Sequence, residues 1–205
     1  MPVIVVANPK GGVGKSTLSS NIAGYFARKG RSVMLGDIDR QQSSRNWLRQ
    51  RPADMPRIQT WEIDAENVSR PPKGASHVVL DTPAGLHGRK LARVLEQADK
   101  VLVPLQASMF DINPTLDFIN EVASLHNEGR LELAVVGNRV RDNTTAADRL
   151  KEFLDTLDVP ALTILRDTQN YVHLSAHGLT LWDVMPHQVS KDLEEWAPIL
   201  NWLKL

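Results

Sequence analysis

A glycine-rich segment near the amino terminus constrains this chain more than any other feature. Its residues are Asn8, Pro9, Lys10, Gly11, Gly12, Val13, Gly14, Lys15, Ser16 and Thr17. The segment follows a run of β-forming residues at 3–7 and precedes a helical pattern at 16–29. Glycines let backbone N–H groups curl around an anion without a Cβ in the way. A strand, a glycine loop and a helix in this order therefore indicate a phosphate-binding loop.

Short apolar runs alternate with helical patterns along the rest of the chain. Continuous apolar runs occur at residues 3–7, 33–35, 78–80, 101–105, 131–136 and 161–165, with a candidate edge strand at 57–61. Such runs are typical of strands buried on both faces of a parallel sheet. Helical patterns lie at residues 16–29, 111–126, 144–157 and 190–203. The alternation predicts an α/β fold with a doubly wound, mostly parallel β-sheet flanked by helices, in one domain over residues 1–205.

Composition excludes several classes of protein. The 205 residues carry 24 basic and 24 acidic side chains, so any nucleic-acid binding needs a local basic patch rather than an overall positive field. The absence of cysteine excludes a disulfide framework, a zinc–thiolate site and a cysteine-held iron–sulfur cluster. No apolar run approaches the roughly 20 residues of a membrane span. The amino terminus also lacks the layout of a signal peptide. We therefore expect a cytoplasmic protein.

Two side chains at the end of the glycine loop have the chemistry that a nucleoside triphosphate requires. Lys15 would reach the β- and γ-phosphates, and the Ser16 hydroxyl would ligate Mg²⁺. The helix that follows would direct the positive end of its dipole at the same phosphates. The ordinary P-loop pattern has glycine where this chain has Pro9, so the strict match fails.

The departure at Pro9 has a parallel in a known family. Residues 10–17 resemble the deviant Walker A motif of the ParA/MinD family of P-loop ATPases, whose signature is the second lysine, here Lys10. Residues 37–41 resemble the family's Asp-x-Asp-Pro-Gln segment, and residues 77–85 resemble its Walker B and switch II region. The late segments 165–167 and 175–178 resemble family motifs more loosely. The resemblance covers nearly the whole chain and implies a P-loop NTPase fold that binds ATP and Mg²⁺.

Three aspartates follow predicted strands. In an open parallel sheet, ligands bind off the carboxyl ends of the strands, where Asp37, Asp39 and Asp81 lie. Asp81 suits a contact to Mg²⁺ through a bound water. Asp39 could orient or deprotonate the attacking water and could also meet the metal through water, whereas Asp37 is equally compatible with a structural role. Arg40 stands where the family has proline, which makes this loop less rigid.

The resemblance also implies roles that spacing alone does not. Lys10 would cross an ATP-dependent homodimer and touch phosphate in the other subunit, which makes Lys10, Lys15 and Asp39 the implied catalytic residues. Asn138 would contact the adenine, although nothing in composition distinguishes ATP from GTP. The implied nucleotide-binding residues are Lys10, Gly11, Gly12, Val13, Gly14, Lys15, Ser16, Thr17 and Asn138.

The ParA branch of the family implies partners. Its members bind double-stranded DNA without sequence preference as ATP dimers, and a ParB-like or cargo-adaptor protein then stimulates hydrolysis and releases them. Candidate DNA contacts in this chain are Arg139, Arg141 and Arg166, with Arg149 and Lys151 on a predicted helix. Scattered surface arginines are the alternative interpretation. A protein of this kind would be associated with the nucleoid.

Other branches of the family fit less well. The iron protein of nitrogenase holds its cluster with cysteines, which this chain lacks. MinD-type proteins end in a basic amphipathic helix, whereas residues 192–205 contain three acids and one lysine, so we expect this helix to pack on the sheet and to avoid membranes. The chain begins directly at its first predicted strand, which resembles the small ParA class without an amino-terminal DNA-binding domain.

Two functions remain open on the sequence. The first is an ATPase that positions a plasmid, a chromosome or another cellular cargo. The second is a metabolic ATP-dependent ligase or synthetase of related fold. The second requires a further constellation of substrate-binding residues, and none is evident in the sequence. Lys10 favours the first.

Overall fold

The computed structural model describes residues 1–65, 68–125 and 131–204, with the backbone alone for residues 109–112. Its strands are β1 (Val3–Val6), β2 (Val33–Asp37), β3 (Ile58–Gln59), β4 (His77–Asp81), β5 (Lys100–Gln106), β6 (Glu132–Val140) and β7 (Ala161–Arg166). Its helices are α1 (Lys15–Arg28), α2 (Ser43–Gln50), α3 (Gly88–Leu95), α4 (Met109–Leu125), α5 (Thr145–Asp155), α6 (Gln169–Ala176) and α7 (Ser190–Trp202), with short 3₁₀ turns η1 (Leu181–Asp183) and η2 (Pro186–Gln188).

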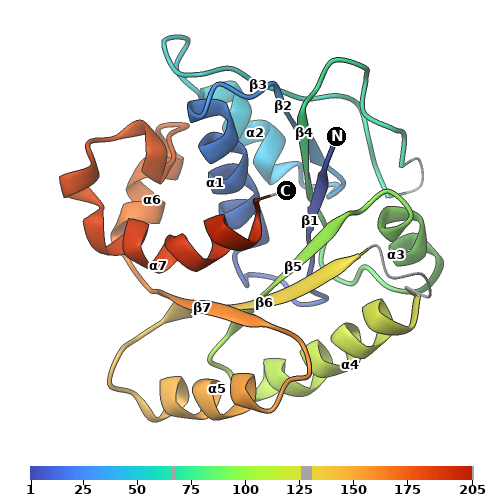
Figure 1. The fold of residues 1–205 in the computed structure, drawn as a ribbon, viewed down its shortest axis with the longest axis vertical. Helices are drawn as coiled ribbons and strands as arrows, with labels where there is room; N and C mark the ends of the chain where they lie inside the picture. The colour runs from blue at the N-terminus through green and yellow to red at the C-terminus, as the bar shows by residue number, and fades with distance from the viewer. Residues whose placement is uncertain (66–67, 126–130, 205) are drawn as a thin grey trace.

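The described strands form one sheet in which every pair is parallel. The strand order is β3-β2-β4-β1-β5-β6-β7 (Figure 1). The predicted doubly wound sheet is thereby confirmed, including the edge strand β3, which is shorter than the range expected for it. Helices lie on both faces, as parallel strands require, because each crossover connection needs a helix.

Successive side chains of a strand point into two separate hydrophobic cores, one on each face of the sheet. Val3 and Val5 of β1 face the core that α3, α4 and α5 cover. Ile4 and Val6 face the opposite core, which α1, α2 and α7 cover (Figure 1). Adjacent side chains of a strand point to opposite faces, so a strand between two helical layers has to be apolar throughout. This explains the continuous apolar run that begins the chain.

The position of β1 fixes where a ligand can bind. β1 lies between β4 and β5, and the chain leaves it through the glycine loop into α1. The connection from β1 runs to β2 on one side of the sheet, and β5 lies on the other side. In open α/β sheets, this reversal opens a crevice beyond the carboxyl ends of the strands. The glycine loop therefore lies at the crevice.

Several elements differ from the predicted ones. β2 continues to Asp37, and β6 continues to Val140, so Asn138 and Arg139 lie within a strand rather than after it. α4 begins at Met109, earlier than expected, and its predicted end at residue 126 lies outside the described residues. The helices α2, α3 and α6 were not predicted, because each has only 8 residues and few of them are buried.

The carboxyl-terminal helix packs as expected. Trp196 and Ile199 of α7 are fully buried, and Leu203 closes the same core. Thr144 caps α5 by accepting a hydrogen bond from the backbone N–H of Ala147, which confirms the expected cap. Among the described helices, none is long and apolar enough to cross a membrane.

A buried ion pair joins Arg51, the residue after α2, to Asp183 of η1. The guanidinium of Arg51 donates to Asp183 at 2.9 Å, and the two side chains are 5% and 0% exposed. Arg51 also donates to the carbonyl of Gly178 at 3.0 Å. A Cβ at Gly178 would come within 2.5 Å of the Arg51 backbone, and Gly178 has a φ of +67°. Gly178, in one of the loosely matching late motifs, is therefore required by packing.

Gly178→Ala should destabilise the protein more than Gly30→Ala does. Gly30 has a similar φ of +73° but open space around it, so its variant carries only the left-handed backbone cost of about 1–2 kcal/mol. The Gly178 variant adds a clash with backbone, which costs a further 1–3 kcal/mol or so. Urea unfolding of both variants measures the difference. Equal losses would show that the chain relaxes around the new methyl group.

Candidate nucleotide-binding site

The glycine loop has the backbone conformation of an anion-binding nest. Gly12 and Gly14 have φ values of +77° and +95°, which side chains with a Cβ rarely adopt. α1 begins at Lys15, so its first backbone N–H groups continue the curved row of donors from the loop. The loop and the helix terminus together can hold phosphate oxygens.

Asn8 fixes the start of the loop to β5 and α4. Its buried amide donates to the carbonyl of Pro104 at 2.7 Å and to the hydroxyl of Thr115 at 3.2 Å. Its carbonyl oxygen accepts from the backbone N–H of Lys10 at 2.8 Å. One side chain thus connects β1 to β5 and α4 and sets the direction in which the loop leaves the sheet.

Three side chains hold the carbonyl groups on the outer side of the loop. Gln106 and Arg139 donate to the carbonyl of Gly12 at 2.9 Å and 3.1 Å. Asn138 donates to the carbonyl of Val13 at 2.7 Å, and a Cβ at Gly14 would collide with the Asn138 amide. With their carbonyls turned outward and bonded, the peptide groups present their N–H groups inward. The loop is therefore organised before a ligand binds.

Lys15 lies beneath the loop in a partly dehydrated position. The side chain is 7% exposed, and its ammonium donates to the carbonyl of Lys10 at 2.6 Å. Burial lowers the pKa of Lys15, while the nearby charges of Asp81 and Asp39 raise it. The ammonium thus contacts the loop and is close enough to Asp81 and Asp39 for their charges to act on it. The Lys10 carbonyl is a neutral acceptor. A bound phosphate would give the Lys15 ammonium a negatively charged acceptor and hence a stronger hydrogen bond.

Asp81 is the most buried carboxyl group of the site. Burial raises its pKa to about 7, and the hydroxyls of Ser16 and Ser44 lower it. The Ser44 hydroxyl donates to Oδ2 at 2.5 Å, while Oδ1 has no hydrogen-bond partner among the described residues. A buried oxygen without a donor is the group that a metal-bound water would satisfy. Asp81, Lys15 and Ser16 therefore fit a Mg²⁺–nucleotide complex.

The two other aspartates have separate structural positions. Asp37 accepts from the backbone N–H groups of Asp39 at 3.0 Å and Arg45 at 3.1 Å, so it holds the start of α2. Burial raises the pKa of Asp37, and these backbone donors lower it. Asp39 is half-buried and accepts from the N–H of Gln41 at 3.0 Å. Of the two, Asp37 has the structural role that the sequence left open, whereas Asp39 lines a cavity of about 440 Å³ together with Pro83 and Gly85.

A small cavity beside the loop has the position expected for a base. Its volume is about 160 Å³, and its lining includes Gly14, Thr17, Asn138, Asp167 and Tyr171. Asn138 lies there as predicted, although its amide nitrogen is bonded to the loop. An adenine contact by Asn138 stays a prediction.

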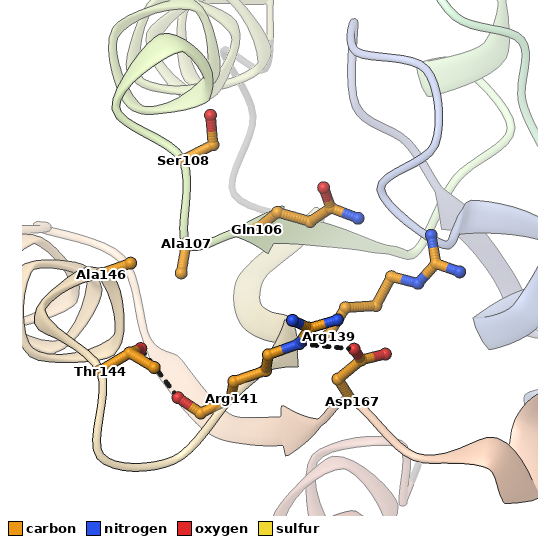
Figure 2. A pocket seen from close by; sticks show the side chains of 8 residues that line it. All are labelled: Gln106, Ala107, Ser108, Arg139, Arg141, Thr144, Ala146 and Asp167. Atoms are coloured by element: carbon orange, nitrogen blue, oxygen red, sulfur yellow. Dashed lines mark hydrogen bonds and ion pairs between the residues drawn. The ribbon is translucent and has the colours of Figure 1, made fainter.

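A larger cavity of about 500 Å³ adjoins it at the ends of β5, β6 and β7. Figure 2 shows two of its lining residues, Arg139 and Arg141, and the ion pair between Arg141 and Asp167, whose length is 3.2 Å. Arg139 has a left-handed φ of +55°, which helps direct its guanidinium to the loop carbonyl of Gly12. Arg139 thus acts on the nucleotide loop in this structure.

Arg166 is bound inside the fold. Its guanidinium donates to Asp192 at 2.7 Å, and Asp192 is 0% exposed. Glu195 also accepts from the backbone N–H of Arg166 at 3.0 Å. Arg139 lines one cavity together with Arg141 and the other together with Arg166. Each of the three has a partner within the chain, and the Arg141 side chain is 79% exposed. Their predicted contacts to DNA remain predictions.

Sequence reasoning missed Gln106, Thr115 and Ser44. Their partners in the crevice are distant in sequence, from 37 residues for Ser44 and Asp81 to 107 for Thr115 and Asn8. Asn8 was noted only as part of the glycine segment. Asn8 and Gln106 each follow a continuous apolar run in the sequence. A polar residue at such a position was the signal that could have identified both as residues of the crevice.

The fold and this crevice define a P-loop nucleotide-binding protein of the ATPase type. A family model described as the CobQ/CobB/MinD/ParA nucleotide binding domain matches residues 4–181. The chain belongs to this family and, within it, resembles the ParA and MinD proteins.

Curated relatives include positioning and partition proteins. The chain is 27% identical over 166 residues to maintenance of carboxysome distribution protein A of Halothiobacillus neapolitanus, which covers 78% of this chain and 76% of the relative. It is 33% identical over 116 residues to protein ParA of Rhizobium radiobacter, covering 54% of this chain and 51% of that protein.

Solved structures confirm the fold at low identity. A plasmid partition protein of Borrelia burgdorferi B31 bound to AMPPNP has a TM-score of 0.78 and 18% identity, covering 98% of this chain and 99% of that one. The MinD cell division protein of Aquifex aeolicus has a TM-score of 0.75 and 18% identity, covering 100% and 98%.

Lys15→Ala should abolish ATP binding. At an effective dielectric near 20, an ammonium about 4 Å from a phosphate charge contributes about 4 kcal/mol. Losing half of that already lowers affinity more than tenfold. Titration of a fluorescent ATP analogue measures it, and circular dichroism checks that the variant folds. Wild-type affinity in a folded variant would remove the phosphate-loop assignment.

Proposed function

We propose that residues 1–205 form a single-domain ParA-like ATPase that hydrolyses ATP to ADP and phosphate. It switches between a monomer and an ATP-bound homodimer that binds double-stranded DNA. A ParB-like or cargo-adaptor protein stimulates hydrolysis, and the cycle partitions or positions a plasmid, a chromosome or another cargo. The protein acts in the cytoplasm in association with the nucleoid and without membrane contact.

The observation that carries this proposal is the second lysine of the loop. Lys10 precedes a loop whose other residues already supply a complete phosphate cradle, with Lys15 beneath it. Lys10 stands at the position of the motif whose lysine, in the ParA/MinD family, contacts phosphate across the dimer. The names of the relatives, a carboxysome distribution protein and a ParA protein, support a positioning role.

Each residue of the crevice has a task in the proposed hydrolysis. Lys15 and the loop N–H groups bind and orient the phosphates, and Asn138 contacts the adenine. Ser16 would hold Mg²⁺ directly, and Asp81 would hold it through water, as Asp39 could also do. Asp39 positions the attacking water and accepts its proton. A Mg²⁺ ion held by these residues would supply positive charge next to the phosphate oxygens.

A metabolic ligase of the same family is the second candidate. The family description includes CobQ and CobB, and cobyrinic acid a,c-diamide synthase of Mycobacterium smegmatis shares the fold with a TM-score of 0.68 and 20% identity. Lys10 favours the first candidate, the ATPase that switches between monomer and dimer. Hydrolysis of ATP in the presence of DNA and an adaptor, with no small-molecule acceptor, discriminates the two candidates.

Asp39→Ala should leave ATP binding intact and stop hydrolysis. A group that positions or deprotonates water contributes about 10² to 10⁴ in rate. The variant should therefore accumulate as an ATP-bound dimer, which light scattering detects alongside a phosphate-release assay. Turnover at the wild-type rate would show that Asp39 has another role.

Lys10→Ala should bind ATP and remain a monomer. The variant keeps the Lys10 carbonyl that accepts from Lys15, so the loop itself is preserved. Sedimentation in ATP, at a concentration where the wild type dimerises, tests this expectation. An unchanged ATP-dependent dimer would contradict the role of Lys10 across the interface.

The ATP-bound form should bind DNA without sequence preference and weakly at high salt. The chain has a formal net charge of zero, so a monomer attracts DNA poorly, and a dimer doubles any local basic patch. With two or three phosphate contacts per subunit, the log–log salt slope should be about −4 to −5. Gel-shift assays at several salt concentrations with ATP, ADP or no nucleotide test this. Equal binding in the three states would exclude a nucleotide switch.

A further inference from the structure

A second group of arginines lies on the opposite edge of the sheet from Arg141 and Arg166. Arg45 and Arg49 extend from α2, and Arg57 immediately precedes the edge strand β3. The three side chains line one open groove of about 540 Å³ together with uncharged residues of α2 and β3. We call this the α2–β3 groove.

The charges in the α2–β3 groove are poorly compensated. Arg45, whose side chain is 26% exposed, lies 3.8 Å from the 93% exposed side chain of Glu62. Among the described residues, Arg49 donates to the neutral side chain of Asn46 at 3.2 Å. Arg57 is exposed, and its side chain makes no hydrogen bond or ion pair with any residue of the described ranges. By contrast, Arg166 has a fully buried carboxylate as its partner. The groove therefore holds the more available positive charge.

We propose that the α2–β3 groove carries the contacts to the DNA phosphate backbone, in place of Arg139, Arg141 and Arg166. Guanidinium groups match phosphate oxygens in geometry and stay charged at every physiological pH. Arg45 and Arg49 are four residues apart on a helix, so they share one face toward the groove. This inference rests on the proposed function, because it assumes that the ATP-bound protein binds DNA.

The short edge strand favours DNA over an acidic peptide as the occupant. A peptide that adds to a sheet edge derives its affinity from a ladder of backbone hydrogen bonds. β3 has only two residues, so it offers few such bonds. Attraction in the groove is therefore mainly electrostatic, which is the character of sequence-independent binding to phosphates.

The position of α2 also links this groove to the nucleotide site. Ser44 donates to Asp81 at 2.5 Å, and the backbone N–H of Arg45 donates to Asp37 at 3.1 Å. The first turn of α2 thus touches two aspartates of the crevice, while the next side chains line the groove. A change of charge at the phosphates can therefore alter where α2 places its arginines.

The test compares two double charge reversals of equal size. Arg49→Glu with Arg57→Glu alters the groove at exposed positions, and Arg141→Glu with Arg149→Glu alters exposed positions near the other edge of the sheet. Binding to a random-sequence duplex is measured with ATP across several salt concentrations. ATP titration and urea unfolding establish that both variants fold and bind nucleotide.

The groove variant should lose at least about tenfold in affinity for the duplex, and its salt slope should fall by about 3 to 4, for two lost contacts in each subunit of a dimer. The control variant should keep its affinity within about twofold. Loss in the control variant alone, equal loss in both variants, or no loss in either would overturn the assignment to the groove. Each of these results would leave the proposed function standing.

Two further outcomes are distinct. Absence of DNA binding by the wild type in every nucleotide state would reject DNA binding in the proposed function and this inference together. Poly-L-glutamate of matched charge serves as a peptide probe at the same salt concentrations. Tighter binding of poly-L-glutamate than of duplex, lost in the groove variant, would assign the groove to an acidic peptide and overturn the assignment to DNA.

Discussion

The nucleotide site depends on one buried contact, the hydrogen bond from Ser44 to Asp81. Asp81 ends β4 beneath the glycine loop, and burial raises its pKa to about 7. A carboxyl group in such a position needs donors, and a single serine from α2 supplies the one to Oδ2. The contact orients Asp81 and ties α2 to the sheet. The remaining oxygen, which has no partner in the described part of the chain, is then left for a metal-bound water.

The loop above Asp81 is organised by side chains from strands that are distant in sequence. Asn8 connects the loop to β5 and α4, and Gln106, Asn138 and Arg139 bind its outward carbonyls. Together these contacts hold the loop N–H groups in a conformation that is already formed without a ligand. Preorganised donors are worth more to a charged ligand than flexible ones, because little reorganisation accompanies binding.

The same contacts explain why arginines near the site differ in what they can do. Arg139 is directed to the loop, Arg141 to Asp167 and Arg166 to the buried Asp192. Arg139 thus supports the nucleotide loop, whereas Arg141 and Arg166 pair with carboxylates elsewhere in the fold. The α2–β3 groove holds arginines with weaker internal partners. In a chain with equal numbers of basic and acidic residues, the pairing of each charge matters more than the count.

The sequence by itself determined the parallel sheet, the glycine loop, the position of Lys15 and Ser16 at the start of α1 and that of Asp81 at the end of β4. These features depend on local periodicity and on the order of strand, loop and helix, which are written in adjacent residues. Only the tertiary structure decided that Asp37 holds α2, that Ser44 meets Asp81 and that Asn138 binds the loop. The last two contacts join residues 37 and 125 positions apart, and they arise only when the sheet brings the carboxyl ends of its strands together. Whether an arginine is paired or available depends equally on packing, because its partners come from elements that no local pattern connects.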